Sequence, residues 1–317
     1  MENQMNGTVA LIGLGAMGAF FAPRFAKQLG KRFFVIADGE RKERLERQGV
    51  TINGTNWKFP VETPDGEPSP CDLIVIAVKD YTLPDAILDI RRFVGEHTLI
   101  LCVMNGVTSE ESVAAAYGRE HVLYSFMRVS IAMEDGSAVF DPKKGCVCFG
   151  EAENDPEHLS DRVRLVRALF EQCGVPYRIP RDMKHALWFK FLCNVGDNMT
   201  CALLGVPFGV FTKSREANEI RVAAMHEVQR LAEKKGIRIT DEEIRALDKT
   251  YASFPFMNRP STLQDLERGR QTEVSMFAGY VVAESEKYGL HAPVCWMFDK
   301  GIRVLEEKNE GAFRPEK

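Results

Sequence analysis

The chain has 317 residues, of which 45% are hydrophobic and 27% are charged. This balance is typical of a globular protein and excludes a largely disordered chain or a long coiled coil. Forty-one Lys and Arg residues against 45 Asp and Glu residues give a net charge of −4, so no overall basic field would attract nucleic acid or an anionic membrane. The length predicts about two domains.

The eight cysteines are scattered, without a C-x-x-C pair or a neighbouring histidine cluster. Some, such as Cys102, sit in apolar runs, where a free thiol behaves as a small hydrophobic group. This pattern favours a reducing compartment over a disulfide framework, and we predict no metal site. The first residues show no signal-peptide pattern, and no apolar run approaches the ~20 residues that span a bilayer. We therefore expect a cytoplasmic protein without a membrane partner.

The first part of the chain alternates short apolar runs with helical patterns. Each run is apolar throughout, as in parallel strands that are covered on both faces. The predicted strands are 8–12, 32–37, 72–78 and 98–104. The predicted helices are 16–29, 40–48, 83–93 and 109–117. This alternation predicts a Rossmann-type α/β fold with a doubly wound, mainly parallel sheet.

Three further patterns follow in the same part of the chain. Asn53-Gly54 stands between alternating residues, which predicts a two-residue hairpin. We expect the strand-like runs within 122–149 to extend the main sheet. An amphipathic helix that ends at Gly174 and a short strand at 175–180 complete the domain.

Beyond residue 180 the pattern is almost entirely helical. The predicted helices are 181–203, 214–235, 240–251, 261–288 and 294–308. Thr240 and Glu243 have the form of a capping box, which marks the start of the third helix. The sequence thus predicts an α/β domain over 1–180 and an all-α domain over 181–317.

A glycine-rich turn joins the first predicted strand to the first predicted helix. Its residues are Gly13, Leu14, Gly15, Ala16, Met17 and Gly18. In such a motif the first glycine permits a tight turn, the second lets the backbone approach a pyrophosphate, and the third allows close packing of helix on strand. The helix N-terminus then offers amide N–H groups to the phosphates. Because the motif lies between a strand and a helix, it predicts a dinucleotide site.

Asp38 ends the second strand, 20 positions after Gly18. A carboxylate there bonds the ribose 2′-hydroxyl of NAD and repels the 2′-phosphate of NADP. Arg41, Lys42 and Arg44 follow and could supply the cationic contacts that NADP needs. These residues also suit an ordinary solvated helix start. By themselves they leave the choice between NAD and NADP open.

Lys79 and Asn105 stand at the carboxyl ends of the third and fourth strands. Each alone fits a surface lysine or a plain turn. Ligands bind at this edge of open α/β sheets, however, so their shared position indicates a site near the nicotinamide.

Lys190, Asn194 and Asn198 are spaced four residues apart, which puts them on one face of a helix. Their neighbours are mostly apolar, so these polar groups would be costly unless they bonded one another or a ligand. Partial desolvation would also lower the lysine pKa, as suits a general acid. The alternative is a structural network of polar side chains or an interdomain salt bridge.

Two short motifs lie further along the helical domain. Ser261 and Gln264 have capping-box form, so Ser261 is expected to be an N-cap, where a hydroxyl also suits a substrate carboxylate. Glu273 follows Thr272 and would be an ordinary surface acid unless it faced Lys190.

At these residues the chain resembles the ketopantoate reductases (2-dehydropantoate 2-reductases). The resemblance covers nearly the whole chain and rests on the order and spacing of its motifs. These are the glycine turn, Lys79, Asn105-Gly106, the W-x-K-x-x-x-N-x-x-x-N run from Trp188 to Asn198, and the motifs at 261–265 and 272–273.

The resemblance implies reduction of a 2-keto acid, ketopantoate, to pantoate in the biosynthesis of pantothenate and coenzyme A. It implies that Lys190 donates a proton while the nicotinamide donates hydride, and that Glu273 positions the lysine and the substrate hydroxyl. Asn194 and Asn198 would hold the substrate, and Ser261 would bind its carboxylate.

By the same resemblance, Lys79 and Asn105 meet the cofactor, and Asn105 also meets the substrate. The resemblance itself favours NADP(H). Family members that use NADPH, however, often carry arginine at the end of the second strand. Here Asp38 stands at that position and keeps NAD(H) open, although Arg41 is available for a phosphate.

Three other functions remain open at this point. One is a β-hydroxyacid dehydrogenase, since those enzymes share the glycine motif and a lysine with a nearby asparagine. Another is a reductase of a different branched 2-keto acid. The third is a non-catalytic NADP-sensing protein, although Lys190 argues against it because a sensor needs no acid catalyst. The sequence leaves the oligomeric state open between a monomer and a homodimer.

Overall fold

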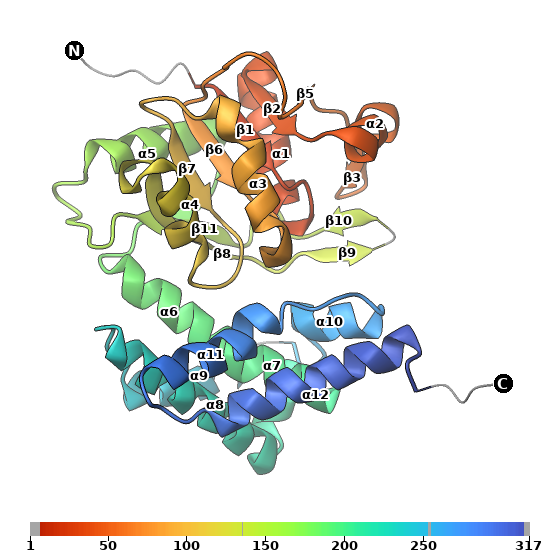
Figure 1. Ribbon diagram of the computed structural model, residues 1–317, viewed down its shortest axis with the longest axis vertical. Coiled ribbons are helices and arrows are strands. Elements are labelled where there is room, and N and C mark those ends of the chain that lie inside the picture. Colours follow the sequence, from red (N-terminus) through yellow and green to blue (C-terminus); the bar gives the residue numbers. More distant parts are fainter. Residues whose placement is uncertain (1–6, 135, 253–254, 314–317) are drawn as a thin grey trace. The chain divides into compact units, whose positions relative to one another are not determined.

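An eight-stranded sheet forms the centre of the first half of the chain (Figure 1). Its order is β12-β11-β8-β7-β6-β1-β2-β5, and all neighbours are parallel except β8 and β11. The strands are β1 (Val9–Ile12), β2 (Phe33–Ile36), β5 (Val61–Glu62), β6 (Leu73–Ile76), β7 (Leu99–Cys102), β8 (Val122–Arg128), β11 (Cys146–Gly150) and β12 (Tyr177–Arg178). The predicted mainly parallel, doubly wound sheet is confirmed.

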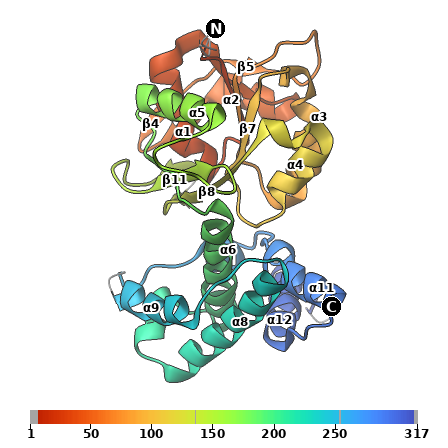
Figure 2. The ribbon, with the colours of Figure 1, turned by 90° about the vertical axis from the view of Figure 1, so that its left-hand side faces the viewer.

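Helices cover both faces of this sheet (Figure 2). Along β1, Val9 and Leu11 belong to the core beneath α1 (Ala16–Leu29) and α5 (Asp161–Cys173). Ala10 and Ile12 belong to the core beneath α3 (Leu83–Asp89) and α4 (Ser109–Tyr117). Alternate side chains of a strand point to opposite faces of the sheet, and both faces are covered here. This explains why β1 is apolar at every position.

The structure is a computed structural model that describes residues 7–134, 136–252 and 255–313. The chain forms two compact units, Met1–Leu187 and Trp188–Lys317. The division falls within helix α6 (Met183–Cys193), a few residues beyond the boundary that the sequence predicts at 180. Among the described residues, no helix has the length and apolar character needed to cross a bilayer.

A second, smaller sheet corrects one expectation. Its order is β4-β3-β10-β9, with strands β3 (Val50–Ile52), β4 (Thr55–Trp57), β9 (Ala132–Glu134) and β10 (Ser137–Val139). The hairpin at Asn53-Gly54 is confirmed, and both residues have positive φ angles of 48° and 76°. Strands β8 and β11 extend the main sheet as expected, but β9 and β10 do not. They leave it because β10 pairs with β3 instead.

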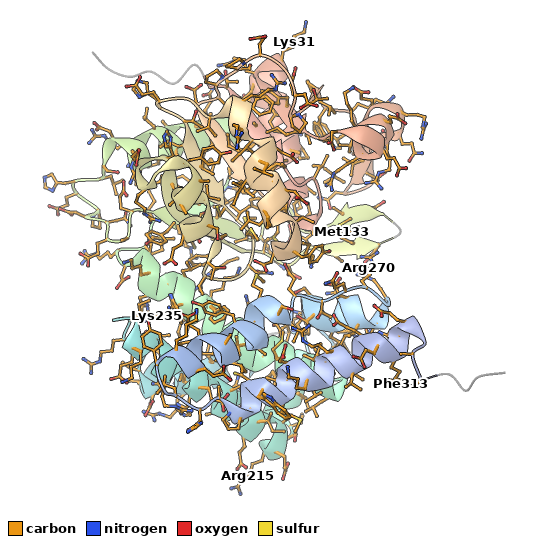
Figure 3. All side chains as sticks on the ribbon, in the orientation of Figure 1. Lys31, Met133, Arg215, Lys235, Arg270 and Phe313 are labelled. Atoms are coloured by element: carbon orange, nitrogen blue, oxygen red, sulfur yellow. The ribbon has the colours of Figure 1, made fainter. Side chains whose placement is uncertain are left out.

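The second unit is all helical, as predicted. Its side chains fill the space among the helices, and Arg215 at the start of α8 points outward (Figure 3). The α-helices are α6, α7 (Met199–Leu204), α8 (Arg215–Lys234), α9 (Asp241–Ala252), α10 (Ser261–Glu267), α11 (Tyr280–Lys287) and α12 (Pro293–Glu310). The capping box is confirmed, because Thr240 Oγ1 accepts the Glu243 N–H and Glu243 Oε2 accepts the Thr240 N–H.

The remaining helical elements are short. Helix α2 spans Gly39–Gln48 in the first unit. The 3₁₀ turns are Gly30–Arg32, Asp80–Thr82, Arg91–Phe93, Arg119–His121 and Phe208–Thr212.

Two π-helical turns interrupt the predicted helices of the second unit. The first π turn (Asn194–Asn198) joins α6 to α7, and the second π turn (Ser275–Gly279) precedes α11. The predicted continuous helix over 261–288 is wrong, because α10 ends at Glu267 and Gly269 has a left-handed φ of 61°. A non-helical segment, 268–274, follows. π turns are rare in proteins, and those that do occur are often found at functional sites.

Candidate active site

The carboxyl ends of three adjacent strands bring predicted cofactor residues to one edge of the main sheet. Ile12 at the end of β1 pairs with Ile76 of β6, and Ile76 pairs with Cys102 of β7. Gly13 directly follows β1. Lys79 lies three residues beyond the end of β6, and Asn105 lies three residues beyond the end of β7. Because β1 has β2 on one side and β6 on the other, the order in which successive strands are added to the sheet reverses at β1. Ligands bind at such a switch point in α/β sheets.

The glycine turn has the geometry that the motif predicts. A Cβ on Gly13 would stand 2.5 Å from the backbone carbon of Ala77 at the end of β6, and its φ is 95°. A Cβ on Gly18 would stand 2.2 Å from the carbonyl oxygen of Gly13. Neither position has room for a side chain, so both glycines are required for packing.

Gly15 differs from the other two glycines. It is the N-cap of α1, its φ is −106°, and a Cβ there would meet nothing within 4 Å. The first turn of α1 carries no acidic residue that would repel an anion. Leu14 beside it is buried, while Ala16 and Met17 are half-buried at the start of the helix. An open helix N-terminus with free space at its second glycine fits a pyrophosphate.

Charges of both signs gather near the end of β2. Asp38 is the N-cap of α2, is exposed, and makes no side-chain capping bond. Partial burial raises the pKa of Asp89, and the charge of Asp38 raises it further. Burial lowers the pKa of Arg41, and the neighbouring guanidinium of Arg44 lowers it again. The carboxylates of Asp38 and Asp89 thus lie near each other, and the guanidiniums of Arg41 and Arg44 lie close enough to repel each other.

The second unit holds the predicted substrate residues other than Asn105. Lys190 lies in the last turn of α6 and is half-buried. Asn194 and Asn198 are the first and last residues of the first π turn. A π turn rotates the chain less per residue than an α turn does, so it offsets the drift that a strict four-residue spacing would produce. Asn198 Nδ2 indeed donates to Asn194 Oδ1 at 3.4 Å.

Asn194 has a donor that the protein does not use. Its Nδ2 atom is buried and has no acceptor among the described residues. An unsatisfied buried donor costs about 1–3 kcal/mol, so it calls for a ligand or an ordered water molecule. This atom is the clearest sign of a binding site on the face predicted from the spacing.

Glu273 lies in the segment between α10 and the second π turn, and it is only 7% exposed. The surrounding backbone is fixed on both sides. Glu306 of α12 accepts the Thr272 N–H at 2.6 Å, and the Glu273 carbonyl accepts the Met276 N–H at 3.1 Å. The first π turn, which carries Asn194, packs against both α10 and the second π turn, the two elements on either side of the segment that holds Glu273. Glu273 is thus a buried acid and not the surface residue that its sequence context alone would suggest.

Ser261 departs from its predicted local role. The N-cap of α10 is Pro260, and Ser261 is the exposed first residue of the helix, without a capping bond from its hydroxyl. The Gln264 side chain donates to the Arg259 carbonyl instead of completing a capping box. The reason is that Pro260 already adopts the extended N-cap conformation, with φ −67° and ψ 159°.

Sequence reasoning missed two kinds of buried charge. Asp197 lies inside the first π turn and is 3% exposed, and Arg221 of α8 is 0% exposed. An acid within an otherwise apolar helical run was the available signal for Asp197. Glu110 at the start of α4 is 1% exposed, and burial raises its pKa to about 7. Nothing in the local sequence distinguishes Glu110 from Glu111 beside it.

Comparison with known proteins decides the family. Residues 9–154 match the family described as ketopantoate reductase PanE/ApbA, and residues 182–305 match its C-terminal family. The chain belongs to the ketopantoate reductase family. As a member it is an NAD(P)-dependent oxidoreductase, and the resemblance seen in the sequence is confirmed. Together the two matches cover both units of this ketopantoate reductase family member.

Relatives match along nearly their full length. The 2-dehydropantoate 2-reductase of Streptococcus pyogenes serotype M6 is 25% identical over 302 residues, covering 94% of this chain and 97% of its own. That of Aquifex aeolicus is 24% identical over 306 residues, covering 93% and 96%.

Solved structures share the fold. A D-mandelate dehydrogenase with NADH and anilino(oxo)acetate has a TM-score of 0.83 at 19% identity, covering 95% of this chain and 99% of its own. A dimeric ketopantoate reductase from Staphylococcus aureus has a TM-score of 0.78 at 18% identity, again covering 95% and 99%.

Proposed function

We propose that this chain reduces ketopantoate to pantoate with NADPH. The observation that carries the proposal is the buried Nδ2 donor of Asn194, which has no acceptor among the described residues. Asn198 donates to the same side chain, and Lys190 stands four residues before it, on the face that helical spacing predicts. A small anionic keto acid has carbonyl, carboxylate and hydroxyl oxygens that such donors can bind. Family membership supports the same substrate class.

Lys190 serves as the general acid in this proposal. A bound nicotinamide supplies hydride to the keto carbon, and the oxygen of that carbonyl becomes an alkoxide. The Lys190 ammonium donates its proton to this oxygen, which gives the 2-hydroxy acid. The cation also stabilises the developing negative charge, and acid catalysis of this kind contributes about 10²–10⁴-fold.

The other residues bind and orient. Asn194 and Asn198 hold the substrate, and Ser261 contacts its carboxylate. Glu273 positions the substrate hydroxyl and the lysine. Its burial and its fixed backbone suit this task, because a carboxylate that orients other groups must itself be held in one position.

The cofactor is held at the switch point of the sheet. Residues 13–18 cradle the pyrophosphate, and Lys79 and Asn105 lie at the nicotinamide end. Arg41 and Arg44 hold the 2′-phosphate, whose charge would relieve the repulsion between the two guanidiniums. The opposing candidate is NAD(H), because the neighbouring carboxylates of Asp38 and Asp89 would both repel a 2′-phosphate.

A second substrate candidate is a 2-keto acid with an aromatic substituent. The fold similarity to D-mandelate dehydrogenase, at a TM-score of 0.83, motivates it. Benzoylformate, the keto acid that corresponds to mandelate, is therefore the matched competitor to ketopantoate.

One experiment separates these possibilities. Oxidation of NADPH and NADH is followed with ketopantoate, benzoylformate and a branched 2-keto acid, and reduction of NADP⁺ and NAD⁺ is followed with a 3-hydroxy acid. We expect the highest kcat/KM with ketopantoate. A clear preference for another acid would identify that acid as the substrate in place of ketopantoate. Cofactor binding without turnover of any acid would indicate an NADP sensor.

Lys190→Ala tests the chemical role. We expect kcat to fall about 10²–10⁴-fold. Lys184→Ala is the matched control, because Lys184 is an exposed lysine on the same helix. If Lys190→Ala kept near-normal kcat, the lysine would not be the proton donor.

We also propose that the protein is cytoplasmic and forms a homodimer. All eight cysteines lie among the described residues and are free, which suits a reducing compartment. The dimeric state of the Staphylococcus aureus structure supports a dimer. Sedimentation velocity at micromolar concentration measures the mass, and a monomer there would reject the dimer.

A further inference from the structure

A fully buried arginine supports the first π turn from behind. Arg221 on α8 is 0% exposed, and its Nη1 lies 3.7 Å from Oδ1 of Asp197 in that turn. Its Nη2 donates to Asp248 Oδ1 of α9 at 2.5 Å, and its guanidinium carbon lies 5.0 Å from the centre of the Phe211 ring. The guanidinium is therefore held by three separate elements and has a fixed place.

The backbone contact beside this ion pair is equally close. A Cβ on Gly196, the residue before Asp197, would stand 2.5 Å from Met225 Cγ and 3.1 Å from the Arg221 carbonyl oxygen. Glycine thus lets the π turn lie directly on α8. The ion pair and the close contact involve adjacent residues of the same turn.

A π turn needs such support. Its hydrogen-bond pattern is rare, and the same residues could instead continue the α-helices on either side. A return to α geometry would rotate Asn198 relative to Asn194 and Lys190. The ion pair opposes that rotation, because moving Asp197 away from Arg221 would leave its carboxylate buried and unpaired, which is strongly destabilising.

The second π turn has a comparable arrangement. Arg303 of α12 donates from Nη2 to Ser275 Oγ at 2.8 Å and from Nε to Asp299 Oδ1 at 2.8 Å. Asp299 Oδ1 lies 3.1 Å from where a Cβ on Gly279 would stand. Each of the two π turns described in this unit is thus backed by an arginine–aspartate pair and contains a glycine that packs closely against its neighbours.

We propose that Arg221 is a positioning residue that acts through Asp197. The pair fixes the first π turn and so directs the side chains of Asn194 and Asn198 toward the substrate. The proposal rests on the proposed function for what these asparagines bind. Its structural part, that the pair holds the turn, can be measured without any substrate.

The test compares Asp197→Asn, which keeps the shape and removes the charge, with Gly196→Ala, which pushes the turn away from α8. We expect KM for the keto acid to rise about tenfold or more in both, since small misplacements of binding groups are costly. KM for the cofactor should change less than about twofold, because the cofactor residues lie in the other unit. Arg221→Lys keeps the charge and should recover part of the loss seen in Arg221→Met.

Amide hydrogen exchange provides the substrate-free readout. In Asp197→Asn we expect faster exchange at residues 194–199, with α12 as the internal reference for global opening. Lys235→Met is the control, because it removes another ion pair of this unit, Lys235 Nζ to Glu284 Oε1 at 3.0 Å. This control should lower the melting temperature without changing KM or the exchange at 194–199.

The outcomes separate the two proposals. If Asp197→Asn behaves like the control, with unchanged KM and unchanged exchange at 194–199, Arg221 and Asp197 are structural only and the inference is wrong. If the wild-type protein reduces no 2-keto acid, the proposed function fails. Exchange at 194–199 then decides the positioning role alone, supporting it if exchange is faster in the variant and overturning it if exchange is unchanged.

Discussion

Asn198 donates a side-chain hydrogen bond to Asn194 Oδ1 at 3.4 Å across the first π turn. This bond uses the acceptor of Asn194 but leaves its Nδ2 donor buried without an acceptor among the described residues. Asn154 in the first unit is the opposite case. Its Nδ2 donates to the carbonyls of Glu151 and Pro180, and its Oδ1 accepts the Glu151 N–H. The fold satisfies the side chain of Asn154 but leaves a donor of Asn194 without an acceptor among the described residues.

Asn194→Leu should therefore separate stability from activity. We expect the free energy of unfolding to change by no more than about 1 kcal/mol, because one hydrogen bond is lost while an unsatisfied donor is removed. KM for the keto acid should rise about tenfold or more, since a loss of about 1.4 kcal/mol of binding free energy weakens affinity tenfold. Urea unfolding and steady-state kinetics measure the two quantities.

Asn154→Leu is the matched control. It removes three hydrogen bonds and leaves their partners unsatisfied, so we expect a loss of about 2–3 kcal/mol with unchanged KM. If Asn194→Leu lost as much stability as Asn154→Leu and kept its KM, Asn194 would be a structural residue.

Two glycines of the phosphate turn should respond differently to alanine. Gly15→Ala should fold normally, because its Cβ would meet nothing within 4 Å and its φ of −106° is allowed for alanine. Cofactor affinity should nevertheless fall about tenfold or more, since the methyl group occupies the space of the pyrophosphate. Gly18→Ala should lose several kcal/mol of stability, because its Cβ would stand 2.2 Å from the Gly13 carbonyl oxygen. Cofactor titration and thermal unfolding check both, and normal cofactor affinity in Gly15→Ala would place the pyrophosphate elsewhere.

Asp38 and Arg41 should shift cofactor preference in opposite directions. Asp38→Asn removes a negative charge from the ribose site, so we expect the ratio of kcat/KM for NADPH to that for NADH to rise about tenfold. Arg41→Ala should lower the same ratio. Glu40→Gln is the control, because Glu40 is exposed in the same helical turn. An unchanged ratio in both test variants would move cofactor selection to other residues.

Glu110 should make stability depend on pH. Its Oε1 accepts the Ser125 N–H at 3.2 Å and its Oε2 accepts from Ser109 Oγ at 3.0 Å. Burial raises its pKa from 4.5 to about 7. Between these values the folded state holds a proton that the unfolded chain has released, so stability falls as the pH rises through this window and levels off above pH ~7.

The variant Glu110→Gln tests this sign. Glutamine mimics the protonated acid, so the variant should gain stability relative to wild type between pH 5 and pH 8, by up to about 3 kcal/mol. Glu111→Gln, at the exposed neighbour, should show no such gain. Urea unfolding of the three proteins at each pH gives the comparison. A constant difference between wild type and Glu110→Gln would mean that Glu110 is already ionised at pH 5.

The main sheet could be predicted because its signals are local. The central strands β1, β2, β6 and β7 are apolar and buried at every position, and helices cover both faces of the sheet there. The glycine turn could be predicted for the same reason, since Gly13 and Gly18 are fixed by contacts within one strand–turn–helix unit and with the neighbouring strand. The strand with which β10 pairs could not be predicted from local sequence. The sequence shows a strand there, but its pairing with β3 depends on a contact between segments more than eighty residues apart.

The site in the second unit divides in the same way. The amino-acid sequence by itself determined the shared face of Lys190, Asn194 and Asn198, because helical spacing is a local property. Only the tertiary structure decided that this face includes a π turn, that the Nδ2 of Asn194 is left without an acceptor, and that Glu273 is buried in a non-helical segment. The physical reason is that burial and the choice between α and π geometry depend on distant partners. Arg221 on α8 and Glu306 on α12 supply those partners, and no periodicity in the chain indicates them.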